Sequence, residues 1–255
     1  MAIKIHKKED FEKMRAAGKL AAETLDYITD FVKEGVTTNH LDKLCHDFIL
    51  ANNAIPAPLN YRGFPKSICT SINHVVCHGI PNDKPLKAQD ILNIDVTVIL
   101  DGWHGDTSRM FFIGEPSIKA RKLVETTYEA LMQAINIVKP GIKTGDIGHI
   151  IQNYAESRNY SVVREYCGHG IGQIFHTDPN ILHFGKKNTG EEIKEGMFFT
   201  IEPMINIGEY PTKIKKDGWT VVTKDRSLSA QFEHTIGVTH NGCEIFTKSK
   251  NKLLV

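Results

Sequence analysis

The chain has 255 residues, enough for one large domain or two small ones. Its 31 basic and 30 acidic side chains give a net charge of +1, which argues against a general nucleic-acid binder, so no DNA partner is expected. With 41% hydrophobic and 24% charged residues, the composition is that of an ordinary globular protein. The longest apolar run, residues 96–100, is too short to span a bilayer, so no membrane partner is expected either.

Cysteine usage and the N-terminus bear on the cell compartment. The five cysteines are an odd number without a CxxC pair, which suits reduced thiols and offers no zinc-finger module. The first ten residues lack the apolar stretch of a secretory signal, and acidic residues appear by Glu9. Together these features predict a cytoplasmic protein.

Two helices are predicted in the first fifth of the chain. Apolar side chains between residues 11 and 32 fall three and four apart, which indicates one stripe of a helix that Gly35 ends. Thr38 is expected to cap a second helix, and the Pro- and Asn-rich residues 52–65 read as an irregular loop. A short helical lead, residues 1–35, thus precedes the rest of the domain.

The same order of elements then repeats. Strands are predicted over residues 67–114, a helix over 117–138, a helix capped by Thr144, and strands again from Ser161 onward. No linker or low-complexity stretch separates the halves. The pattern therefore predicts one α+β domain over residues 1–255, built from two similar halves.

A predicted strand with one apolar face carries the first candidate metal ligand. Residues 91–100, ILNIDVTVIL, alternate cleanly, with Asp95 on the polar face. Asp101-Gly102 is a hairpin-turn signal that folds the next strand back, so Asp106 can lie near Asp95 on the same face. An Asp paired with a nearby Lys is the plainer interpretation of Asp95 taken alone. Two adjacent carboxylates repel unless a cation lies between them.

The second half repeats this arrangement with glutamates. In residues 197–207, MFFTIEPMINI, Glu202 lies on a polar face, and Pro203 indicates a strand edge or bulge there. Glu233 belongs to another alternating run, which puts His234 on the opposite face, in a packing role. Four inward carboxylates cannot all stay charged in one cavity without cations, and oxygen ligands in this number suit a pair of divalent metals.

Three histidines accompany the carboxylates. Glycines around His169 leave its imidazole accessible as a nitrogen ligand, and Gln173 breaks a dinucleotide-binding GxGxxG pattern there. His176 has the alternative of an inert loop histidine, and His78 that of a strand end before a turn. Cys77 has no base at a recognisable spacing, which disfavours a cysteine nucleophile.

Seven short motifs in order resemble one family over essentially the whole chain, the methionine aminopeptidases of the short bacterial type I class. Any one motif is weak, whereas all seven at the family's approximate spacing are specific. They are CHGIP at His78, NIDV at Asp95, HGDTSRMF at Asp106, GHGIG at His169, FH at His176, TIEP at Glu202 and QFEHT at Glu233.

The resemblance implies a fold and a reaction. The fold is the pita-bread fold, with two pseudo-symmetric halves, a curved antiparallel sheet and helices on its outer face. The reaction removes the initiator methionine from nascent polypeptides whose second residue is small and uncharged, by attack of a hydroxide activated by two divalent metals. The donor set accepts Co, Mn, Fe, Zn or Ni, and cellular availability decides among them. The family expectation is a monomer.

The resemblance also implies roles for single residues. Glu202 is implied to transfer the proton, His176 to stabilise the oxyanion and His78 to contact the peptide. The implied metal ligands are Asp95, Asp106, His169, Glu202 and Glu233. The implied methionine pocket consists of Tyr61, Phe64, Cys69, Phe175 and Trp219, with His78 and His176 at its edge.

Some features depart from the family pattern or leave alternatives open. Phe64 stands where many relatives carry Tyr, and Pro58 where some carry Cys, so substrate preference is less determined than catalysis. Tyr61 and Phe64 have the alternative of loop anchors. The rivals for the whole chain are an Xaa-Pro peptidase, which usually carries an extra N-terminal domain, and a non-catalytic binding module, which would have lost metal ligands.

Clustered lysines suggest one macromolecular partner. Because the substrate is a nascent chain, a transient contact with the ribosome is expected, and lysines are the side chains that bind RNA phosphates. A solvated charge run is the alternative. The candidate lysines are Lys213, Lys215, Lys216, Lys248, Lys250 and Lys252.

Overall fold

A computed structural model describes residues 3–251 of the chain. Lys252, one of the lysines singled out above, lies outside these described residues. Four α-helices and two short 3-10 helices are present among them. They are α1 (Lys8–Ile28), η1 (Thr29–Phe31), α2 (Thr38–Ala51), η2 (Tyr61–Gly63), α3 (Ile118–Ile137) and α4 (Thr144–Glu156).

The strands form one large sheet and two small ones. The large sheet runs in the order β1-β4-β5-β14-β9-β7-β8, with β2 added on β4 and β15 on β14, and all its pairings are antiparallel. The small sheets have the orders β13-β10-β6 and β11-β12-β3. The strands of the first half are β1 (Ile55–Pro56), β2 (Cys69–Ile72), β3 (Val75–Cys77), β4 (Ile91–Leu100) and β5 (Trp103–Phe112). Those of the second half are β6 (Ser161–Val162), β7 (Gly168–Gly170), β8 (Thr177–Ile181), β9 (Phe198–Ile201), β10 (Met204–Asn206), β11 (Thr212–Ile214), β12 (Val221–Thr223), β13 (Ser229–Gln231), β14 (Glu233–Val238) and β15 (Cys243–Ile245).

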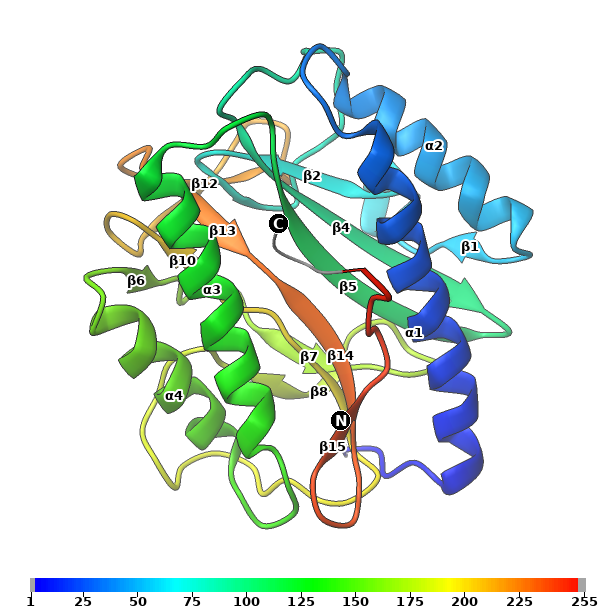
Figure 1. Ribbon diagram of the computed structural model, residues 1–255. Coiled ribbons are helices and arrows are strands. Elements are labelled where there is room, and N and C mark those ends of the chain that lie inside the picture. Colours follow the sequence, from blue (N-terminus) through cyan, green and yellow to red (C-terminus); the bar gives the residue numbers. More distant parts are fainter. Residues whose placement is uncertain (1–2, 252–255) are drawn as a thin grey trace.

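Each half of the sheet packs against its own pair of helices. Figure 1 shows α1 and α2 beside β4 and β5, and α3 and α4 on the other side of β14. Two separate apolar clusters fill these interfaces. Leu25, Leu41 and Ile94 belong to the first, whereas Leu131, Ile151 and Phe199 belong to the second. The predicted α+β class, with a curved antiparallel sheet and helices packed outside it, is confirmed.

Several predicted boundaries shift by one to a few residues. The first helix ends at Ile28 and tightens into η1, well before Gly35, where the sequence pattern placed its end. Thr37, rather than Thr38, caps α2 by accepting from the His40 N–H at 3.2 Å. Lys143 occupies the N-cap position of α4, so Thr144 is its first residue and not its cap. Helix ends are the positions that periodicity determines least well.

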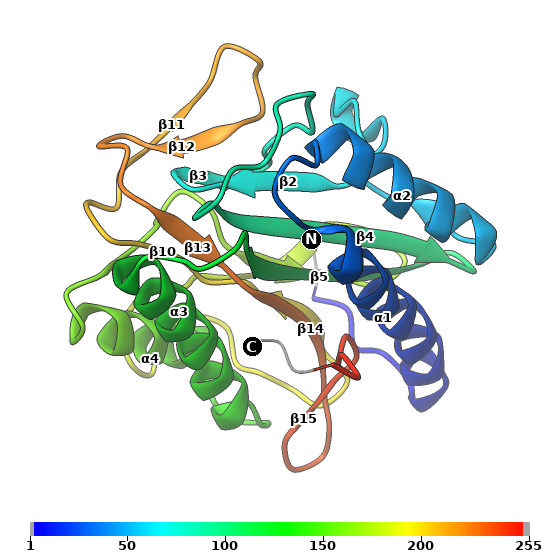
Figure 2. The same cartoon turned by 45° about the horizontal axis from the view of Figure 1, so that its top comes forward.

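The strand predictions match more closely. β4 and β5 pair over ten residues around an Asp101-Gly102 turn in which both φ angles are positive, as a type I′ turn requires. The predicted irregularity at Pro203 is a complete break, since β9 belongs to the large sheet and β10 to a small one. The loop over residues 52–65 also contains short ordered pieces, β1 and η2. Figure 2 shows β11 and β12 projecting from the body of the molecule, at the opposite end from β15.

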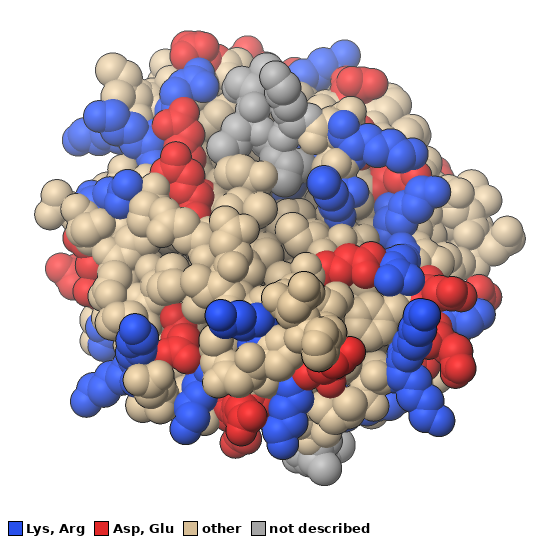
Figure 3. Space-filling view, turned by 60° about the horizontal axis from the view of Figure 1, so that its bottom comes forward, with Lys and Arg blue, Asp and Glu red and all other residues tan. Residues whose placement is uncertain are grey.

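Neither a basic patch nor a membrane-spanning helix is found in the parts of the molecule described next. On the face shown in Figure 3, Lys and Arg side chains are interspersed with Asp and Glu and do not form one basic patch. Among residues 3–251, no helix is both long and apolar enough to cross a membrane.

Candidate metal and active site

The β4–β5 hairpin presents two aspartates on one face of the sheet. Asp95 pairs with Ser108 across the hairpin and Asp106 with Thr97, so the two aspartates are diagonal neighbours. The residues on either side of Asp95, Ile94 and Val96, lie in the apolar cluster under α1 and α2. Because side chains alternate along a strand, Asp95 and Asp106 face away from the helices.

Two glutamates reach the same place from the other half. Glu233 begins β14 and pairs with Ser108 of β5, which puts it beside the hairpin aspartates. Glu202 follows the last residue of β9, the other neighbour of β14. His169 lies in β7, which pairs with β9 through Gly170. The sheet order β4-β5-β14-β9-β7 thus brings together residues separated by up to 138 positions in the chain, from Asp95 to Glu233.

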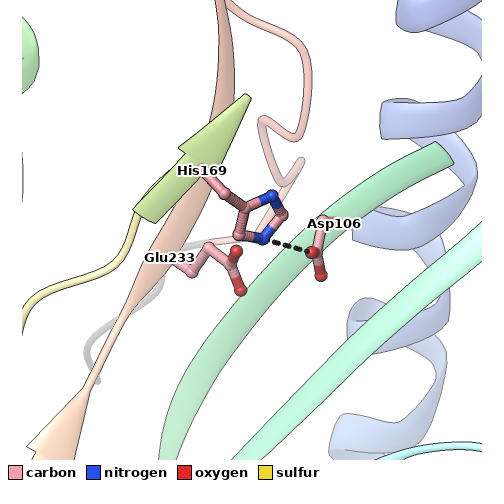
Figure 4. A group of neighbouring side chains, drawn as sticks. All are labelled: Asp106, His169 and Glu233. Carbon is pink, nitrogen blue, oxygen red and sulfur yellow. Dashed lines mark ion pairs between the residues drawn. The ribbon is translucent and has the colours of Figure 1, made fainter. Parts of the chain in front are cut away.

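Side-chain distances confirm that these residues converge. The Nε2 atom of His169 lies 3.6 Å from Oδ2 of Asp106 and 3.7 Å from Oε1 of Glu202. One ligand atom each from Asp106, His169 and Glu233 lie within 4.8 Å of one another. Figure 4 shows these three side chains pointing toward a common centre. Asp95 lines the same cavity.

The electrostatics of the carboxylates call for a cation. Burial raises the pKa of Asp95 to about 7. Burial and mutual repulsion raise the pKa values of Asp106, Glu202 and Glu233 well above their usual range. Within residues 3–251, no Lys or Arg pairs with any of the four, and Arg109 of β5 pairs with Asp26 instead, at 2.8 Å. Four carboxylates and an imidazole at one point are a donor set that divalent metals fit, because the metals supply the missing positive charge.

Neighbouring side chains orient the carboxylates. Thr97 donates to Oδ1 of Asp106 at 2.7 Å, and Thr200 donates to Oε1 of Glu202 at 2.8 Å. The Thr200 hydroxyl also accepts from the His169 N–H at 3.0 Å, so it links two of the converging residues. Gln231 donates to Oε2 of Glu202 at 3.3 Å. Glu202 and His169 are thus held by side-chain contacts outside the backbone ladder.

His183 is a site neighbour that the sequence analysis missed. It is fully buried, and its Nε2 accepts from the Glu202 N–H at 3.1 Å. Burial lowers the pKa of His183 to about 3, so the ring is neutral and able to accept. No motif surrounds His183, and its contact depends on how the chain after β8 packs against the end of β9. His234, by contrast, hydrogen-bonds Thr247 at 2.9 Å, in agreement with the packing role predicted for it.

The converging carboxylates form the floor of a cavity of about 360 Å³. The Phe64 ring meets Trp219 edge-on at 5.2 Å, and His78 meets the rings of Tyr166 and Trp219 at 5.6 and 6.2 Å. All seven residues of the predicted methionine pocket line this cavity: Tyr61, Phe64, Cys69, His78, Phe175, His176 and Trp219. Sequence reasoning missed Arg62, Tyr166 and Cys167, which also line it and carry no local signal.

The cavity's histidines and cysteines are uncharged at neutral pH. Burial lowers the pKa of His78 and of His169 to about 4, and that of His176 to about 3. Burial raises the thiol pKa values of Cys69 and Cys77 well above their usual range. A protonated thiol is a poor nucleophile, which agrees with the low weight given to a cysteine mechanism.

Comparisons with known proteins agree with this geometry. The model of metallopeptidase family M24 matches residues 12–240. A methionine aminopeptidase from Rickettsia prowazekii is 69% identical over 99% of this chain and 98% of its own length. One from Escherichia coli K12 is 57% identical over 98% and 96% of the two chains. The crystal structure of the Rickettsia prowazekii methionine aminopeptidase superposes with a TM-score of 0.96, covering 96% of this chain and 100% of that one.

Proposed function

The chain belongs to metallopeptidase family M24, and from this premise we propose that it removes the N-terminal methionine from nascent polypeptides whose second residue is small and uncharged. The observation that carries the proposal is a cavity with metal-binding carboxylates at its floor and aromatic and sulfur-bearing walls above them. A thioether makes favourable contacts with aromatic edges, so such walls suit a methionine side chain. Relatives with the name methionine aminopeptidase match along almost the full chain.

The metal centre of this proposal consists of two divalent ions. The five predicted ligands would hold these ions together: Asp95, Asp106, His169, Glu202 and Glu233. When bound, the ions would lower the pKa of a water molecule from that of bulk water toward about 7 and neutralise charge on the scissile carbonyl. The ligand types accept Co, Mn, Fe, Zn or Ni.

The chain's own residues then position the peptide and move the proton. Glu202 accepts the proton of the attacking water and passes it to the departing amine, with its carboxylate held by Thr200 and Gln231. His176 is neutral and donates to the carbonyl oxygen as negative charge develops there. His78 contacts the peptide beside the Trp219 wall. The aromatic cavity holds the methionine side chain while these steps occur.

Methionine release from Met-Ala-Ser tests the proposal. The expected result is release that disappears with a chelator, returns with added manganese or cobalt, and is at least about 100-fold slower for Met-Lys-Ser. A Xaa-Pro peptide in the same assay tests the rival peptidase activity. Cleavage of the Xaa-Pro peptide in preference to Met-Ala-Ser, or no cleavage with metal bound, would overturn the proposal.

We further propose that the protein is a cytoplasmic monomer that contacts the ribosome transiently. Lys213, Lys215 and Lys216 are exposed on and after β11, beside the Trp219 edge of the cavity, and are the better placed lysines. Lys250 pairs instead with Glu23 of α1 at 3.1 Å. Replacing Lys213, Lys215 and Lys216 by Glu is expected to weaken co-sedimentation with ribosomes. Unchanged sedimentation would exclude this surface as the ribosome contact.

A further inference from the structure

Tyr61 lines the cavity with its ring and also makes a hydrogen bond to His176 through its hydroxyl. Its hydroxyl lies 2.9 Å from Nδ1 of His176, and the two rings stack with centroids 5.2 Å apart and an interplanar angle of 30°. The Tyr61 ring also meets the Phe175 ring, with centroids 4.9 Å apart. Among the described residues, Tyr61 supplies the hydrogen bond to this nitrogen of His176.

The backbone around Tyr61 is shaped to hold that contact. Asn60 and Arg62 both have positive φ, 66° and 49°, and they flank Tyr61 in η2. The Tyr61 N–H donates to the Pro58 carbonyl at 2.9 Å, and its own carbonyl accepts from the Phe64 N–H at 2.9 Å. A left-handed conformation at a residue such as Arg62 costs about 1 kcal/mol or more, and such strain concentrates at functional sites.

The protons on His176 can be counted. A neutral imidazole carries one N–H, so one ring nitrogen donates and the other accepts. If Nε2 is to donate to the substrate carbonyl, Nδ1 must be the acceptor, and the Tyr61 hydroxyl must be the donor. In the reverse arrangement Nδ1–H would donate to Tyr61 and Nε2 would have no proton to offer.

We propose that Tyr61 is a positioning residue for His176: its hydroxyl donates to Nδ1 and holds the imidazole in the tautomer that presents Nε2–H to the cavity. This inference rests on the proposed function, because that function gives His176 a proton to donate. It assigns Tyr61 two separable parts. The ring is a wall of the cavity, whereas the hydroxyl fixes the chemistry of its neighbour.

Tyr61→Phe separates the two parts because it keeps the ring and removes the hydroxyl. With metal-loaded enzyme and Met-Ala-Ser, kcat is expected to fall about tenfold while KM stays within about twofold. In a His176→Ala background, Tyr61→Phe is expected to cause no further loss of kcat, because the Tyr61 hydroxyl acts only through His176. Tyr27→Phe is the matched control, since Tyr27 stacks on Phe48 in the α1–α2 interface, and it should leave kcat unchanged.

Nitrogen NMR of the histidine rings provides a readout that does not depend on activity. In the zinc-loaded protein, the ring signals that disappear in His176→Ala are expected to show a protonated Nε2 and an unprotonated Nδ1. Tyr61→Phe should mix the two tautomers or reverse them, and Tyr27→Phe should not. Tautomers unchanged in Tyr61→Phe would overturn the inference, and so would an unchanged kcat. A wild-type enzyme that releases no methionine yet shows the Nε2–H form, lost in Tyr61→Phe, would overturn the proposed function and leave the tautomer control standing.

Discussion

In the first half of the site, Asp95 and Asp106 stand on neighbouring strands of one hairpin, whereas in the second half Glu202 and Glu233 stand at two breaks in the strands. Glu202 lies where the chain leaves β9 of the large sheet for β10, and Glu233 lies where it returns from β13 to β14. The hairpin pairs over ten residues without a bulge, so its ladder fixes both aspartates. Glu233 still pairs with Ser108 as the first residue of β14, whereas Glu202 lies outside any strand and has no ladder to fix its side chain.

Side-chain contacts hold Glu202 in place of a backbone ladder. Glu202 receives hydrogen bonds on both carboxylate oxygens, from Thr200 and Gln231, and its N–H is held by His183. Among the hydrogen bonds of the described residues, the Asp106 carboxylate has one partner, Thr97, and the Thr235 hydroxyl bonds the backbone N–H and carbonyl of Asp106. The comparison teaches that ligands of one site can be fixed either by regular backbone or by a shell of polar side chains. Substitutions next to the two kinds of ligand should therefore reduce activity to different extents.

The largest effect is expected from removing a charge that both halves share. Asp106→Asn keeps the shape of the side chain and should lower kcat/KM for Met-Ala-Ser by at least about 1000-fold, because a central metal ligand is lost. The same variant, freed of metal, should melt at a higher temperature than metal-free wild type at pH 8, since one buried like charge is gone. Calorimetry checks the second point, and a lower melting temperature would mean that the carboxylates do not repel.

The next prediction compares the two threonines. Thr200→Val removes a donor to Glu202 and leaves the buried His169 N–H without its acceptor, whereas Thr97→Val removes only one donor to Asp106. A hydrogen bond to a charged group contributes about 1.5–3 kcal/mol. We expect about a 100-fold loss of kcat/KM in Thr200→Val and about tenfold in Thr97→Val. Equal losses in steady-state assays would remove the distinction between the halves.

The thermal stability of the metal-free protein should depend on pH because its buried carboxylates repel one another. The folded pKa of Asp95, about 7, lies above the unfolded value of about 3.9, so its stabilising contribution is complete below pH 4 and is lost as the pH rises through 7. The melting temperature with chelator should therefore fall between pH 5 and 8, and the increase produced by added zinc should grow over the same range. Asp95→Asn should flatten part of this slope. A zinc effect independent of pH would contradict the account.

The smallest effect is expected at the tip of the hairpin. Gly102 has φ of 79°, and a Cβ there would meet nothing within 4 Å, so Gly102→Ala costs backbone strain alone. That cost is about 1 kcal/mol, or roughly 2–4 °C in melting temperature for a chain of this size. Metal affinity should stay unchanged because the ladder below the turn remains. A loss of metal binding would show that the hairpin register depends on its turn.

The same contrast explains what the sequence could reveal. Asp95 and Asp106 were predictable as neighbours because period-two alternation and a two-residue turn determine a hairpin's register. Glu202 and Glu233 could be placed on polar strand faces from the alternation of their neighbours. The strand breaks beside them could not be predicted. Nor could the hydrogen bond between the Glu202 N–H and His183, because it depends on how the chain after β8 packs against the end of β9. Similarly, nothing in the Pro- and Asn-rich loop signals that Tyr61 reaches His176. Contacts of this kind follow from tertiary packing and not from any local pattern.

Titration of the chelated enzyme with manganese, following bound metal and methionine release together, tests the central claim most directly. The account predicts no release without metal, activity that rises with occupancy, and binding that saturates at two ions per chain. In Asp106→Asn both curves should collapse together. Full activity in the presence of chelator, or saturation of binding without any methionine release, would contradict the claim that these carboxylates hold the metals of a methionine-removing site.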